Sequence, residues 1–113
     1  MLTPDQFRVI ALGMEGAVEQ AHMGHPDFRA NGRIFATLHP GGAAGMVKLT
    51  PAQQEEFMRE DPVAFVPASG AWGRQGCTTV KLAEVAEDTL GQAMTFAWRN
   101  TRKQTAATRK KKK

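Results

Sequence analysis

The residues of this chain best suited to chemistry are three histidines, one cysteine and a group of basic and aromatic side chains around one predicted hairpin. Imidazole and thiolate bind borderline metals, and a thiolate beside an imidazole is a nucleophile with its base. The spacing supports neither chemistry, so we expect no metal site, no cofactor and no catalysis, with the cysteine a small buried hydrophobe. These residues are His22, His25, His39 and Cys77.

The basic and aromatic side chains surround Asn31-Gly32, a pair typical of the two-residue type I′ turn because both positions tolerate positive φ. This turn would place Phe28 opposite Phe35. Side chains alternate along a strand, so one sheet face would carry an aromatic pair among cations, which suits base stacking and phosphate contact. The alternative is a structural cross-strand pair with solvated cations around it. The residues of this face are Phe28, Arg33, Phe35, His39, Lys48 and Lys81.

A glycine-rich segment, Gly70–Gly76, precedes a predicted strand over 77–82 and contains Trp72 and Arg74. Its backbone amides could cradle a phosphate, with Arg74 adding charge. The segment lacks the lysine and hydroxyl of a P-loop and leads into no helix. The alternative is a tight connection in which Trp72 covers the edge of the core.

The charge of the chain is unevenly distributed. The whole chain carries a formal net charge of +4 over 113 residues. The last twelve residues, 102–113, contain seven cations and no acid, which leaves a net charge of −3 on residues 1–101. We therefore predict one domain over 1–101 and a disordered basic tail over 102–113, in which Lys110 and Lys111 would attract nucleic acid nonspecifically.

The elements that must position these residues are helices and short strands in mixed order. Thr3-Pro4-Asp5-Gln6 and Thr50-Pro51-Ala52-Gln53 both predict a helix start with a capping box. The second helix should end near Asp61, and a final helix should follow Leu82, with Glu84, Glu87 and Asp88 near its start. The apolar stripes expected to be buried are Phe7, Ile10, Ala11 and Met14 in the first helix, and Ala86, Leu90, Ala93, Met94 and Ala97 in the last.

Short loops between the strands predict antiparallel connections and an α+β fold of two layers, with helices packed on one face of an antiparallel sheet. The face toward the helices would carry Ile34, Ala36, Leu38, Val47, Leu49, Val80 and Leu82. No apolar run approaches the roughly 20 residues that span a bilayer, and the N-terminus lacks the pattern of an export signal. With one cysteine there is no intrachain disulfide. We expect a cytoplasmic protein without a membrane partner.

The hairpin segment Phe28–Leu38, the Val47-Lys48-Leu49-Thr50 strand end, the glycine-rich segment and the final helix together resemble the MmcQ/YjbR family of small bacterial proteins. The resemblance covers most of residues 3–100 and implies a CyaY-like α+β fold. It also implies a DNA-binding label that rests largely on fold comparison. The acidic iron-binding ridge of CyaY is not matched, because the first helix region has only Asp5 and Glu15, so iron binding is not implied.

Two functions remain open from the sequence. The first is weak, salt-sensitive DNA or other nucleic-acid binding without enzymatic activity, through the sheet face, the glycine-rich segment and the tail. The second is a protein-interaction or small-ligand-binding module, or a homodimer, that uses Phe28, Phe35 and the Trp72 segment. The residues assigned to nucleic-acid binding are Phe28, Arg33, Phe35, Lys48, Arg74, Lys81, Lys110 and Lys111.

Overall fold

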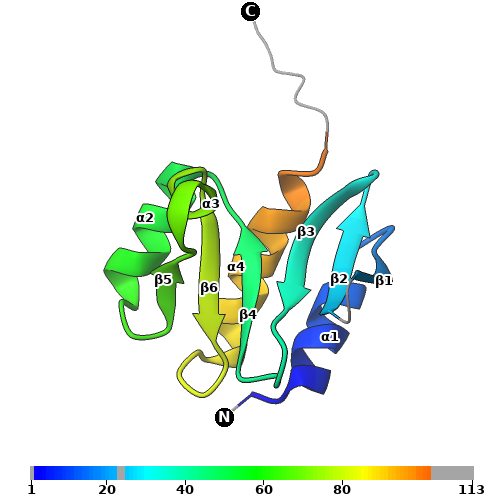
Figure 1. Ribbon diagram of the computed structural model, residues 1–113, viewed down its shortest axis with the longest axis horizontal. Coiled ribbons are helices and arrows are strands. Elements are labelled where there is room, and N and C mark those ends of the chain that lie inside the picture. Colours follow the sequence, from blue (N-terminus) through cyan, green and yellow to red (C-terminus); the bar gives the residue numbers. More distant parts are fainter. Residues whose placement is uncertain (1, 23–24, 103–113) are drawn as a thin grey trace, which may run out of the picture.

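The computed structural model describes residues 2–22 and 25–102, which form one six-stranded sheet with four helices (Figure 1). The strand order is β1-β2-β3-β4-β6-β5, and every neighbouring pair is antiparallel. The predicted α+β class is therefore confirmed. The elements are α1 (Pro4–Leu12), β1 (Val18–His22), β2 (His25–Ala30), β3 (Arg33–Leu38), β4 (Ala44–Lys48), α2 (Pro51–Glu60), β5 (Phe65–Pro67), α3 (Gly70–Arg74), β6 (Cys77–Lys81) and α4 (Glu87–Arg99).

The three longer helices cover one face of the sheet. Figure 1 shows α4 behind β3 and β4, with α1 beside it. At the β5 edge the ring of Phe57 in α2 packs on Phe65 and on Phe96 of α4, with centroids 5.2 and 6.0 Å apart. The predicted stripe of α4 is buried, except that Ala86 is the exposed N-cap. Its buried residues are Leu90, Ala93, Met94 and Ala97.

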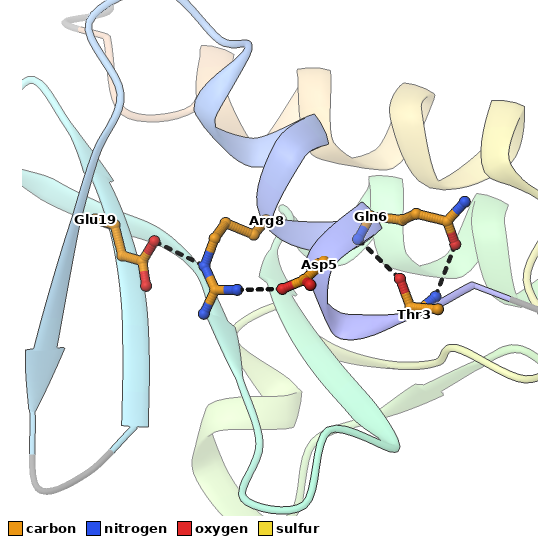
Figure 2. A network of polar contacts seen from close by, with 5 residues as sticks. All are labelled: Thr3, Asp5, Gln6, Arg8 and Glu19. Carbon is orange, nitrogen blue, oxygen red and sulfur yellow. Dashed lines mark hydrogen bonds and ion pairs between the residues drawn. The ribbon is translucent and has the colours of Figure 1, made fainter.

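Both predicted capping boxes are present. In α1 the Thr3 hydroxyl accepts from the Gln6 amide at 3.1 Å, and the Gln6 side chain accepts from the Thr3 amide at 2.8 Å (Figure 2). The same figure shows Arg8 donating to Asp5 at 2.7 Å and to Glu19 at 2.9 Å, which links α1 to β1. The second box, at the start of α2, has the same pattern, and α2 ends at Glu60 as predicted.

The hairpin turn is confirmed, but its register is not the predicted one. Asn31 and Gly32 have φ of 55° and 77°, as a type I′ turn requires. The register shifts in the middle of the hairpin, so that Phe28 lies opposite Ala36, and Phe35 is the extra residue of a bulge. A bulge breaks the alternation of side chains between the two faces.

This register overturns the predicted placement of four side chains. Arg33 was expected on the open face, but it lies opposite the buried Ala30 and so projects on the helix side at the end of the sheet. Phe28 and Phe35 were expected on the open face, but both are fully buried under the helices, where the Phe28 ring packs on Phe7 at 5.9 Å. Ile34 was expected in the core, but it lies on the open face. The other residues predicted for the helix face are buried: Ala36, Leu38, Val47, Leu49, Val80 and Leu82.

Two further sequence predictions concern the C-terminal tail and membrane-spanning helices. Apart from Arg102, the predicted tail lies outside the described residues, and so do Lys110 and Lys111. Within residues 2–22 and 25–102, every helix is too short or too polar to cross a bilayer.

Candidate functional site

The open face of the sheet, opposite the longer helices, is hollowed where β3, β4 and β6 lie side by side. Outward-pointing side chains of these strands form the floor, and α3 with the two residues before it forms one wall. The volume is about 370 Å³. We call it the tryptophan hollow, and its lining includes Ile34, Thr37, Met46, Lys48, Trp72 and Cys77.

The wall of the tryptophan hollow depends on glycines in the segment predicted as a loop, which contains the short helix α3. A Cβ on Gly73 would overlap the Ala68 carbonyl, and one on Gly76, whose φ is +110°, would overlap the Leu49 carbonyl. Only glycine lets the backbone approach so closely at both positions. The sequence signal for this wall was therefore the glycine content of the segment.

A buried glutamine ties this segment to α2. The Gln54 side-chain nitrogen lies within 3.0 Å of the Gly73 and Cys77 carbonyl oxygens and within 3.2 Å of the Thr78 hydroxyl. Gln54 is 8% exposed, so these hydrogen bonds satisfy polar groups that water does not reach. They hold α3 against the start of β6.

The alternative prediction for this segment, that Trp72 covers the core edge, is wrong. The Gly73 backbone packs against Ala68 and its carbonyl accepts from the buried Gln54 side chain, whereas the neighbouring Trp72 indole is 64% exposed. The amides of Gln75 and Gly76 donate to the carbonyls of Ala71 and Gly73, so they are not free to cradle a phosphate. The segment contributes a ring to the tryptophan hollow.

A second, more polar hollow adjoins the first. Its volume is about 280 Å³, and it shares Ile34 and Lys48 with the tryptophan hollow. Arg33 and Lys48 are exposed at its rim, and neither belongs to a salt bridge among the described residues. We call it the polar hollow, and its other lining includes Thr50, Gln75, Asn100 and Thr101.

The structure brings together only some of the predicted binding residues. Arg33 and Lys48 meet at the polar hollow, and Lys48 also reaches the tryptophan hollow. Arg74 is exposed at the end of α3 but lines neither hollow, and Lys81 is exposed at the far end of β6, opposite Ala44. Phe28 and Phe35 are in the core.

Cys77 is on the floor of the tryptophan hollow, 5% exposed. Burial raises the pKa of its thiol, although the charge of Lys48 acts in the opposite direction. A thiol with a raised pKa is protonated at neutral pH and is a poor nucleophile. This environment is consistent with the small buried residue that the sequence predicts.

His25 and His39 line a third hollow of about 260 Å³, which continues from the tryptophan hollow along β3. Burial, and secondarily the charge of His25, lowers the pKa of His39. Asp27 in the same hollow is buried and accepts two hydrogen bonds from Arg29, at 2.9 and 3.2 Å. Among the side chains that the structure describes, no three metal-ligating residues lie close enough to hold an ion.

Sequence reasoning missed Ile34, Thr37 and Met46 as lining residues. One signal was available, because Ile34, Phe35 and Ala36 are three consecutive apolar residues in a strand. Strict alternation cannot place all three on one face. Such a run indicates a bulge or a strand with apolar contacts on both faces.

The comparisons with known proteins agree with this fold. The family model YjbR matches residues 12–100. The crystal structure of the Deinococcus radiodurans protein DR2400, described by the domain DUF419, superposes with a TM-score of 0.79 at 18% identity, over 96% of this chain and 84% of that one. No curated protein matches the chain. The match over most of the sequence shows that the chain belongs to the YjbR family.

Proposed function

We propose that the chain is a non-enzymatic, cytoplasmic protein that binds single-stranded nucleic acid weakly, with the tryptophan hollow receiving a base. The observation that carries the proposal is the exposed Trp72 indole beside an apolar floor that includes Ile34 and Met46. Aromatic side chains on open surfaces are the usual platforms for unpaired bases, because every base has a π-face.

The shape of the surface favours a single strand over a duplex. A base in a duplex is stacked between its neighbours and cannot enter a hollow of about 370 Å³ unless it is extruded. Single strands present splayed bases that stack on aromatic rings without that cost. We therefore expect a preference for single-stranded DNA or RNA.

The local charge also supports the proposal. Residues 1–101 carry a net charge of −3, so the domain as a whole repels polyanions. The surface around the tryptophan hollow differs, because Lys48 is exposed on the open face, Arg33 is exposed beside it at the end of the sheet, and Asp27 pairs with Arg29. Binding would thus be confined to this surface, with the basic tail adding nonspecific attraction.

A second candidate is docking of a protein partner, in which Trp72 acts as an anchor. The apolar lining of the tryptophan hollow favours it, because exposed tryptophans dominate many protein interfaces. The form of this alternative that uses Phe28 and Phe35 lacks support, since both rings are buried. Docking through an apolar hollow would depend little on salt.

The test uses the full-length chain with the cations of residues 103–113 replaced by glutamine, and measures binding of a labelled single strand and its duplex by anisotropy. Trp72→Ala should weaken single-strand binding about tenfold, the effect of losing one stacked base. Raising salt from about 50 to about 200 mM should weaken binding further. Val9→Ala, which truncates a side chain 70% exposed on α1, is the matched control.

Two outcomes would reject this function. If the tail-neutralised chain binds no single strand at low salt, the open face is not a nucleic-acid site and only the tail attracts polyanions. If Trp72→Ala and Val9→Ala bind equally well, the indole is not a stacking platform.

A further inference from the structure

The two adjoining hollows differ in place and in chemistry: the tryptophan hollow lies on the open face, and the polar hollow lies at the end of the sheet beside the C-terminus of α4. The tryptophan hollow is lined largely by apolar side chains, including Ile34, Met46 and Trp72. The polar hollow has a larger share of polar groups, including Arg33, Gln75 and Asn100, beside apolar lining from Leu49, Pro51 and Ala97. Because Ile34 and Lys48 line both hollows, the hollows are adjacent and a single ligand can extend from one into the other.

The polar hollow carries uncompensated positive charge. Arg33 comes from the first residue of β3 and Lys48 from the last residue of β4, and neither makes a salt bridge among the described residues. No carboxylate lines either hollow in this part of the chain. On α2, Glu55 and Glu56 line neither hollow and each lies 3.8 Å from the Arg59 guanidinium. An anion here would meet two cations and no repulsion.

The walls of the polar hollow are held in place by hydrogen bonds. The Asn100 amide nitrogen donates to the Lys48 carbonyl at 3.2 Å and to the Gln53 side chain at 2.8 Å. The Asn31 amide donates to the Thr101 hydroxyl at 3.0 Å, which ties the hairpin turn to the end of α4. The cations therefore project from a fixed backbone, which lowers the ordering cost of binding.

We propose that the two adjoining hollows together recognise one nucleotide unit, with its base in the tryptophan hollow and its phosphate in the polar hollow between Arg33 and Lys48. This inference rests on the proposed function and deepens it by naming the minimal ligand. Base and phosphate are joined by a single sugar, so one apolar and one cationic hollow that share a wall suit the two ends. Arginine suits the phosphate because its planar fork can donate two hydrogen bonds.

The experiment titrates the full-length, tail-neutralised chain with three probes: adenosine, adenosine 5′-monophosphate and inorganic phosphate. The monophosphate should bind about tenfold more tightly than adenosine, as expected for charge-assisted hydrogen bonds. Arg33→Gln should reduce that ratio to about threefold or less, and Lys48→Gln should act in the same direction. Trp72→Ala should weaken the binding of adenosine and of its monophosphate by a similar factor, so that the ratio of the two affinities stays unchanged.

Lys81→Gln is the matched control, since it removes an exposed cation at the far end of β6, away from both hollows. It should leave the ratio at its parent value. An equal effect of Lys81→Gln and Arg33→Gln would overturn the inference, because general charge would then explain binding. Inorganic phosphate that binds as tightly as the monophosphate would also overturn it.

The failures of the two proposals can be told apart. If the single strand binds but adenosine and its monophosphate bind equally, the nucleotide-unit inference is wrong and the proposed function stands. If neither the single strand nor any of the three probes binds, the proposed function is wrong as well.

Discussion

The two faces of the sheet are formed by the same strands, but one face is covered by helices and the other is accessible. On the covered face Val47 and Val80 are fully buried, with α4 packed on β4 and α2 on β6. On the open face their sequence neighbours Lys48 and Thr79 remain accessible. Because side chains alternate along a strand, one residue supports the core on the covered face and the next is available to a ligand on the open face. Substitutions should therefore affect folding on one face and binding on the other.

Phe28→Ala should show the largest effect of any substitution considered. The ring is fully buried against Phe7, so its loss should lower the free energy of unfolding by about 3 to 5 kcal/mol. Ile34→Ala, on the open face of the same hairpin, should cost about 1 kcal/mol or less. Urea denaturation of both variants measures the difference. Equal losses would show that the two faces are not energetically distinct.

Gly73→Ala tests whether the wall of the tryptophan hollow depends on close backbone packing. The added Cβ would overlap the Ala68 carbonyl, so we expect a loss of about 1 to 3 kcal/mol, with displacement of α3 and loss of single-strand binding. Gly91→Ala is the matched change in α4, where a Cβ would meet nothing within 4 Å. It should stabilise the protein by about 0.5 to 1 kcal/mol. Thermal melts and anisotropy measure the two effects, and a harmless Gly73→Ala would contradict this account of α3.

The smallest expected effect is a pH dependence of stability that comes from the open face. Burial lowers the pKa of His39 below its ordinary value of 6.5, so the unfolded chain takes up more protons as the pH falls through that value. Stability should therefore be highest above that pH and decrease as the solution becomes more acidic. His39→Gln should make the dependence flatter between about pH 7 and about pH 5.5, above the range in which ordinary carboxylates titrate.

Urea midpoints at the two pH values measure this effect. His25→Gln is the control, and it should reduce the slope less than His39→Gln does, because the His25 charge is the smaller of the two causes. Identical slopes for the parent and His39→Gln would show that His39 does not couple folding to protonation.

Local features of the fold were predictable because their causes lie within a few residues. The Thr3 and Thr50 capping boxes were read from the sequence, since both partners of each box are three residues apart. The Asn31-Gly32 turn was equally local. The buried stripe of α4 followed from helical periodicity, which a single helix displays in full. The separation of a basic tail from an acidic domain rests on the order of the charges alone and stays a prediction, because residues 103–113 lie outside the described residues.

The candidate site was less predictable because it depends on distant partners. A one-residue bulge sends Phe28 and Phe35 into the core and Ile34 to the open face, and no turn signal reveals it. The close approach of Gly73 to Ala68, supported by Gln54 from α2, decides that Trp72 points outward. The sequence by itself thus determined the capped helices, the hairpin turn and the charge pattern, which arise from short-range chemistry, but not the short helix α3. Only the tertiary structure decided which ring is available to a ligand, because that depends on packing between segments far apart in the chain.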